Sequence, residues 1–152
     1  MGLLTDYFAA VGDEHAASVA VEGPGAVDPA TMRRTFAAVE LKGIDPFVVL
    51  GTLTSLLVGR PYAEVVRLPR HGSLVATAGD EGPWVVTVSD ELVAALAAAT
   101  SATVEEIAVR WAATDELAGS DPRDLAGALH ELAALCVRVD DDGHRLYCWT
   151  SL

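Results

Sequence analysis

Residues 41–61 read LKGIDPFVVLGTLTSLLVGRP, and this stretch decides the fold. Its large apolar residues recur at intervals of three and four, which is the spacing of one helical face. They are Val49, Leu50, Leu53, Leu56 and Leu57. No charged residue falls between Asp45 and Arg60. The stretch therefore predicts a central, mostly buried helix, with Leu53 in the middle of its buried face.

Both ends of this predicted helix carry residues that start or stop helices. Asp45 can accept hydrogen bonds from the free amides of a first turn, and Pro46 suits the first helical position. Gly59 can turn left-handed at the other end, and Pro61 cannot continue a helix. These signals bound the helix at residues 46–58. The opposite face carries only small residues, Gly51, Thr52 and Ser55, which lets another element approach closely.

Four other segments predict extended structure. The clearest is a hairpin that pairs residues 74–78 with residues 84–88, because both runs are rich in β-branched residues and the GDEGP turn joins them. Residues 3–10 predict a first strand and residues 36–41 an extended segment. Residues 145–151 predict a last strand with two apolar faces, as expected for a strand in the centre of a sheet.

Two further long helices follow from capping and periodicity. Ser89 can cap a helix over residues 90–99, with two acids in its first turn. Asp121 followed by proline is a second start signal, and the apolar residues after it predict a helix over residues 122–137. Three aspartates at 140–142 would oppose the negative end of a helix, so we expect the helix to stop before them.

Residues 103–113 carry two conflicting patterns. Thr103 and Glu106 have the spacing of a capping box, which favours a helix. Large residues then alternate with smaller or charged ones up to Trp111, which favours a strand. We expect one helical turn followed by an extended stretch.

The composition indicates a globular protein of one domain. A length of 152 residues is enough to bury a real core. The elements together predict a single α+β domain over residues 1–152. We expect an antiparallel or mixed sheet, with three main helices packed largely on one side: 46–58, 90–99 and 122–137.

Charge and patterning exclude several classes of function. The net charge of -12 argues against nucleic-acid binding, and it either suits a basic protein partner or serves solubility alone. The longest charge-free run is shorter than the roughly 20 residues of a membrane span. The first residues lack the basic start of a secretory signal, and only two cysteines are present. We therefore expect a cytoplasmic protein with no membrane contact.

Four segments follow, in order, the pattern of a known family. MGLLTDYFAA resembles the opening strand of the YfbM-like family of small uncharacterised bacterial proteins, and IDPFVVLGTLTSLLVG resembles its helix with a Leu-Thr-Gly-like stop. SDELVAALAAA and DPRDLAGALHELAALCVRVDDDGHRLYCWTSL resemble its third quarter and its closing helix, turn and strand. The central helix of the family usually carries Trp and His, where this chain has Val48, Val49 and Thr52. The resemblance implies one α+β domain and, because the family has no assigned activity, no reaction.

The one basic cluster of the chain is a candidate anion site. Arg60, Arg67, Arg70 and His71 lie close together in sequence, with only Glu64 among them. Paired guanidinium groups could bind a carboxylate or a phosphate. The simpler interpretation is an exposed loop whose arginines meet surface acids.

Trp111 and Asp115 form a second candidate, because a tryptophan beside acids could line a ligand pocket. The simpler interpretation of Trp111 is a core residue. Cys136 and Cys148 are interpreted as small buried residues. No spacing typical of a metal site, a cofactor loop or a catalytic elbow is present, so we expect no cofactor and no metal.

Two classes of function therefore compete. The first, which we favour, is a non-enzymatic interaction protein whose acidity suits a basic protein partner, for example an inhibitor that covers the positively charged site of a toxin. The second is a small-molecule enzyme or ligand-binding protein with a pocket near Trp111, Arg60 and His71. The acids come as adjacent pairs along the chain, which predicts acidity spread around the surface.

Overall fold

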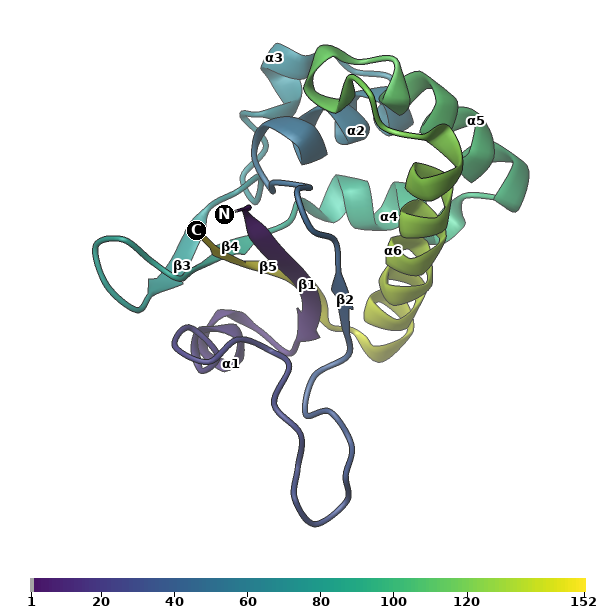
Figure 1. Cartoon of the computed structure of the whole chain (residues 1–152). Helices are drawn as coiled ribbons and strands as arrows, with labels where there is room; N and C mark the ends of the chain where they lie inside the picture. The colour runs from purple at the N-terminus through teal and green to yellow at the C-terminus, as the bar shows by residue number, and fades with distance from the viewer. Residues whose placement is uncertain (1) are drawn as a thin grey trace.

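Five strands form one antiparallel sheet in the computed structural model, which describes residues 2–152 (Figure 1). The strands are β1 (Leu4–Ala10), β2 (Ala38–Glu40), β3 (Leu74–Thr77), β4 (Trp84–Thr87) and β5 (Arg145–Ser151). Their order across the sheet is β2-β1-β5-β4-β3. The predicted hairpin is β3–β4, and β5 lies in the centre between β1 and β4, as predicted. The sheet class is thus antiparallel, and the predicted α+β domain is confirmed.

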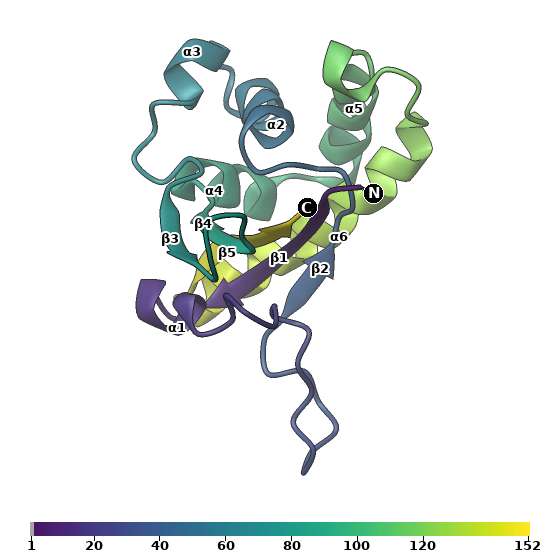
Figure 2. The same ribbon diagram turned by 60° about the vertical axis from the view of Figure 1, so that its left-hand side comes forward.

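The main helices cover one face of this sheet, which confirms the prediction of one-sided packing (Figures 1 and 2). The helical elements are α1 (Asp13–Ala17), α2 (Val48–Val58), α3 (Tyr62–Val65), α4 (Asp90–Ala98), α5 (Ser101–Ala112), η1 (Asp115–Leu117) and α6 (Pro122–Asp142). The short helix α1 lies on the opposite face. Within residues 2–152, none of these helices combines the length and the apolar character needed to cross a membrane.

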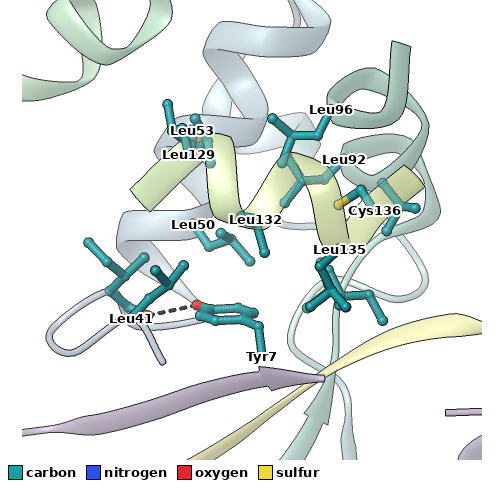
Figure 3. Packing of buried hydrophobic residues seen from close by; sticks show 14 of the residues in the cluster. Tyr7, Leu41, Leu50, Leu53, Leu92, Leu96, Leu129, Leu132, Leu135 and Cys136 are labelled. Carbon is teal, nitrogen blue, oxygen red and sulfur yellow. Dashed lines mark hydrogen bonds between the residues drawn. The ribbon is translucent and has the colours of Figure 1, made fainter. Parts of the chain in front are cut away.

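The larger core lies between the sheet and the main helices (Figure 3). Leu53 of α2 and Leu132 of α6 are fully buried in it, together with Tyr7 of β1. The Tyr7 hydroxyl donates a 2.6 Å hydrogen bond to the backbone carbonyl of Ile44, so the polar end of this buried ring is satisfied. A smaller core on the other face packs Phe8 against Phe36 in an edge-to-face arrangement, with ring centres 5.6 Å apart.

Helix α2 begins at Val48, two residues later than predicted, and Phe47 occupies its N-cap position, but Asp45 still satisfies its first amides. Both carboxylate oxygens of Asp45 accept hydrogen bonds from first-turn amides, the shortest of them 2.7 Å from the amide nitrogen of Val48. Gly59 ends the helix with a φ angle of 68°. The face of α2 that carries small residues lies close to other side chains, as predicted. A side chain at Gly51 would meet the ring of Tyr62 at 3.0 Å and the ring of His71 at 3.2 Å.

The expectation of an extended stretch within residues 103–113 is wrong, because α5 is one continuous helix from Ser101 to Ala112. Thr100 caps this helix instead of Thr103. The Thr100 hydroxyl accepts a 3.1 Å hydrogen bond from the Thr103 amide. The buried residues follow the helical spacing of three and four and leave Val109 exposed. They are Val104, Ile107, Ala108 and Trp111. The apparent alternation arose because exposed Val109 lies between two buried large residues.

The predicted end of the last helix is also wrong, since α6 continues through the three aspartates to Asp142. Val139 is buried in the core, and this packing holds the last turns in helical form. The three aspartates are exposed, and water weakens their repulsion with the helix terminus. Gly143 then ends the helix with a φ angle of 66°.

Residues 25–35 form a narrow, exposed loop that projects from the domain before the chain enters β2 (Figures 1 and 2). Asp28 and Arg33 join its two arms through a 2.8 Å bond from the Asp28 amide to the Arg33 carbonyl. Val27 and Arg34 form an isolated bridge closer to the domain. The loop therefore delivers Arg34 to the edge of the sheet, beside β2.

Candidate functional site

The largest groove lies between the connection from β2 to α2 and the segment that contains η1 and the start of α6. It has a volume of about 900 Å³. Five acidic residues line it, against two basic residues, Lys42 and Arg123. The acidic residues are Glu40, Glu116, Asp121, Asp124 and Glu131. We call this surface the acidic groove.

Two of these five carboxylates already have basic partners. Asp121 caps α6 and pairs with Arg123 at 3.3 Å, and Glu40 lies 3.9 Å from Arg34. Glu116, Asp124 and Glu131 form no ion pair within residues 2–152, and all three are exposed. Lys42 is the one basic residue of the lining without an ion pair in the described part of the chain, so the acidic groove carries an excess of negative charge along one side of α6.

A second groove, of about 560 Å³, continues from the first between β2 and α6. The two share Glu40 and Glu131. Small side chains keep this second groove open, those of Ala37, Ala38 and Ala134. Arg34 and Arg138 line it too. We call this surface the edge groove, because β2 is the edge strand of the sheet.

The register of β2 leaves backbone groups free on its outer side. The carbonyl of Ala37 and the amide of Leu41 form hydrogen bonds with the backbone of β1. Val39, midway between them, lies opposite Tyr7 of β1. Antiparallel pairing alternates, so the N–H and C=O groups of Ala38 and Glu40 point away from β1. No strand lies beyond β2, and no hydrogen bond within residues 2–152 engages these outward groups. The edge groove thus contains an unpaired stretch of strand backbone.

A carboxylate pair lies at the same edge, on the face opposite α6. Asp6 of β1 stands directly opposite Glu40 of β2. The pKa of Asp6 is raised, first by burial and then by the charge of Glu40, while Arg34 acts in the opposite direction. The two acids line a hollow of about 320 Å³ whose wall includes Trp149. Negative charge therefore extends from the acidic groove around the edge of the sheet.

The predicted basic cluster does not converge on one point. Arg60 is exposed and pairs with Glu64 on the next turn, 3.2 Å away. Arg67 is exposed and has no ion pair within the described residues. His71 is half-buried, and its Nε2 donates to the carbonyl of Phe47 at 2.9 Å. Burial lowers the pKa of His71, against the opposing effects of that hydrogen bond and of the Asp45 charge.

Arg70 departs from the expectation of an exposed arginine. Its side chain is only 13 % exposed and lies between Asp13 at 3.4 Å and Asp90 at 3.5 Å. The guanidinium carbon is 5.2 Å from the ring centre of Tyr147, whose hydroxyl donates a 2.7 Å bond to Asp13. The pKa of Asp13 is lowered by the Tyr147 hydrogen bond and then by Arg70. Arg70 therefore ties α1, α4 and β5 together.

The second candidate, around Trp111 and Asp115, separates into a core residue and a surface residue. Trp111 is buried, and its indole N–H donates a 3.2 Å bond to the carbonyl of Val49. Asp115 lines a hollow of about 550 Å³ between α2, α3 and η1, together with Ser55 and Tyr62. Trp111 does not line this hollow, and neither do Arg60 and His71.

The cysteines offer no accessible nucleophile. Cys136 and Cys148 are buried and unbonded to each other, in agreement with their interpretation as small core residues. Burial raises the pKa of the Cys136 thiol to about 12 and also raises that of Cys148. Among residues 2–152 no three His, Cys, Asp or Glu side chains gather as a metal-ligand set.

Sequence reasoning missed the two grooves. The acidic pairs do lie on separate elements, but Glu40 and Glu131, which have no acidic neighbour in the sequence, line one groove with Glu116 and Asp124. The acidic pairs are thus spread over several elements as expected, and the acidic groove adds a concentration of acids that they did not predict. The sequence offered one signal for these grooves, which is the position of Glu40 near the end of an extended segment. That signal could not be interpreted without knowing that α6 packs beside this segment.

Comparisons with protein-family models, with curated proteins and with solved structures give no match for this chain. The resemblance to the YfbM-like family therefore stays a prediction.

Proposed function

We propose that this chain is a non-enzymatic interaction protein that binds a basic partner protein through the acidic groove. One observation carries the proposal: Glu116, Asp124 and Glu131 face a large groove without ion-pair partners in the described residues. Acids that share one groove in this way form a negative surface, which a positive surface of a partner can cover with several charge pairs. The net charge of -12 acts in the same direction, because it steers a basic protein toward this chain.

The spacing of these acids suits a protein more than a small cation. Asp124 and Glu131 are seven positions apart on α6, about 10 Å along its axis at the rise of an α-helix. Lysine and arginine side chains along a partner surface or segment can meet carboxylates at such intervals. One form of this function is an inhibitor that covers the positively charged site of a toxin. Two free buried cysteines fit a reducing cytoplasm as the place of the encounter.

A labelled lysine-rich peptide provides the first test, with fluorescence anisotropy as the readout. We expect the parent protein to bind it and the affinity to fall steeply with added salt, because several charge pairs form. A glutamate-rich peptide of the same length should not bind. The groove variant Glu116→Gln/Asp124→Asn/Glu131→Gln should bind at least about tenfold more weakly, since three charge pairs are lost.

The matched control removes the same number and kind of charges elsewhere. Glu22, Asp80 and Glu81 are exposed and lie outside both grooves. The control Glu22→Gln/Asp80→Asn/Glu81→Gln should therefore keep most of the affinity. Equal losses in the groove variant and in the control would mean that net charge alone attracts the peptide, and would overturn the proposed site.

A ligand-binding function is a second proposal, supported by the hollow lined by Ser55, Tyr62 and Asp115. Tyr62 and Ser55 could position a small polar ligand there, with Arg60 and His71 on neighbouring segments. A thermal-shift screen with phosphorylated and carboxylated metabolites tests it. Stabilisation of the parent that is lost in Tyr62→Ala would favour this function over protein binding.

A further inference from the structure

We propose that an extended basic segment of the partner adds to β2 as a sixth strand of the sheet, in the edge groove. This inference rests on the proposed function and states how the partner is held. Peptides that add to a sheet edge gain affinity from main-chain hydrogen bonds and specificity from the side chains beside them. The edge groove supplies both components.

The backbone component comes from Ala38 and Glu40. Their outward N–H and C=O groups form a row of donors and acceptors that nothing in residues 2–152 satisfies. An exposed edge of this kind is a template for pairing with another chain. Added strands lie about 4.8 Å from the edge strand, which places the partner's backbone inside the edge groove.

The groove has room for such a strand because α6 forms its far wall and carries a small residue there. Ala134 faces the groove, and Leu135 and Val39 give it an apolar surface. A strand exposes its side chains alternately to two sides, so every second residue of the partner would contact α6. Small or β-branched residues fit this side best.

Charge decides what the other residues of the partner are. The side chain of Glu40 lies on the face opposite α6, directly across from Asp6. Arg34 reaches Glu40 at 3.9 Å, but Asp6 has no ion pair within the described residues. A lysine or arginine beside Glu40 would extend this ladder with the opposite charge, and oppositely charged cross-strand neighbours are favourable.

The distribution of charge in the two grooves determines which part of the partner segment lies in each. Arg34 and Arg138 both line the edge groove, and they disfavour basic residues of the partner beside them. Glu40 and Glu131 mark the end where the edge groove opens into the acidic groove. The segment therefore has a short alternating apolar part in the edge groove and a basic block in the acidic groove.

A second copy of this chain is a poorer occupant of the same edge. Pairing two β2 strands would bring together two chains that each carry a charge of -12 and would place their acidic grooves near one another. This alternative has its own signature: protection of the Ala38 and Glu40 amides that rises with protein concentration in the absence of any peptide.

Amide hydrogen exchange measured by NMR tests the proposal on the full chain. The probes are two synthetic peptides with a Val-Thr-Val-Thr run and a Lys-Arg-Lys-Arg block, one with the block first and one with it last. Their controls carry N-methyl groups on the valine and threonine amides and keep the same charge. In the free protein, the amides of Ala38 and Glu40 should exchange fast and that of Val39 slowly, because of these three residues only Val39 occupies a position that is hydrogen-bonded to β1.

At saturating concentration of the better probe, exchange at Ala38 and Glu40 should slow by about tenfold or more, with Val39 unchanged. The N-methylated control should bind about tenfold more weakly, because its donors are blocked. Binding of both peptides without protection at Ala38 and Glu40 would overturn strand addition and leave the proposed function standing. Failure of every basic peptide to bind would overturn both, and concentration-dependent protection without peptide would assign the edge to a second copy.

Discussion

Asp6 and Glu40 lie directly opposite each other on neighbouring strands, at the open edge of the sheet. Like charges in this position destabilise a sheet, and the raised pKa of Asp6 reflects that repulsion after the larger effect of burial. The fold thus keeps the two carboxylates close to each other, and their repulsion lowers its stability. A cationic group arriving at the same edge would relieve the repulsion, which makes the pair a direct reporter of the proposed docking.

The first prediction concerns this pair. Glu40→Gln should lower the pKa of Asp6 toward its usual value, because the second cause of its rise is removed. An NMR titration of the Asp6 carboxyl carbon measures the pKa. Glu105→Gln, which changes an exposed acid of α5, should leave the value unchanged. An unchanged pKa in Glu40→Gln would mean that burial alone raises it.

The second prediction tests α2 as the organising helix. Leu53 is fully buried, so Leu53→Ala should lower the free energy of unfolding by about 2–5 kcal/mol through lost burial and a cavity. Val48 is 42 % exposed on the same helix, and Val48→Ala should change the free energy of unfolding by only about 0.5 kcal/mol. Urea unfolding measures both. Equal effects for the two variants would contradict a central position for α2.

The third prediction separates two arginines that look alike in the sequence. Arg70→Ala should destabilise the protein by about 1–2 kcal/mol, because it removes a largely covered cation from Asp13, Asp90 and the Tyr147 ring. Arg67→Ala removes an exposed side chain without an ion pair in the described residues and should leave stability nearly unchanged. Thermal and urea unfolding compare them. A loss on Arg67→Ala as large as that on Arg70→Ala would refute the structural role of Arg70.

The fourth prediction is a loss of stability at alkaline pH. The pKa of Cys136 is about 12 in the folded protein and 9.0 for an ordinary thiol. The unfolded chain therefore releases this proton first, and the stabilising contribution is complete below pH 9 and is lost progressively as the pH rises toward 12. The slope from this thiol is about 1.4 kcal/mol per pH unit within the window.

Urea unfolding between pH 8 and pH 10.5 tests this dependence. Cys136→Ala should lose stability less steeply with pH than the parent, although Cys148, whose pKa is also raised, still contributes to the slope. The same slope in the parent and in Cys136→Ala would show that Cys136 ionises as readily in the folded protein as in the unfolded one.

The sequence predicted those parts of the fold whose signals are local. Gly59 ends α2 as predicted, and Asp45 marks its start to within a few residues because capping acts locally. The hairpin of β3 and β4 follows from its turn. The central position of β5 was readable because both of its faces are apolar. The errors arose where tertiary packing overrode a local preference. Val139 packs into the core and carries α6 through three unfavourable aspartates, and α5 is helical despite an apparent alternation.

The grooves could not be predicted because their residues are far apart in the sequence. Glu40 and Glu131 meet only because α6 lies across β2 at the edge of the sheet. The basic cluster shows the reverse case, in which residues close in the sequence do not form one site. Arg60 and Arg70 lie near one another along the chain, yet one pairs with Glu64 at the surface and the other is covered by α1, α4 and β5.

The most direct test of the central claim is a map of chemical-shift changes when the isotope-labelled protein is titrated with the lysine-arginine peptides. A localised site predicts that the affected amides form one continuous surface over residues 37–44, 116–131 and 134–138. Exposed acids elsewhere, such as Asp80 and Glu81 in the turn between β3 and β4, should not respond. Changes scattered over all acidic pairs, or confined to the hollow lined by Tyr62 and Asp115, would contradict a binding site at the edge of the sheet.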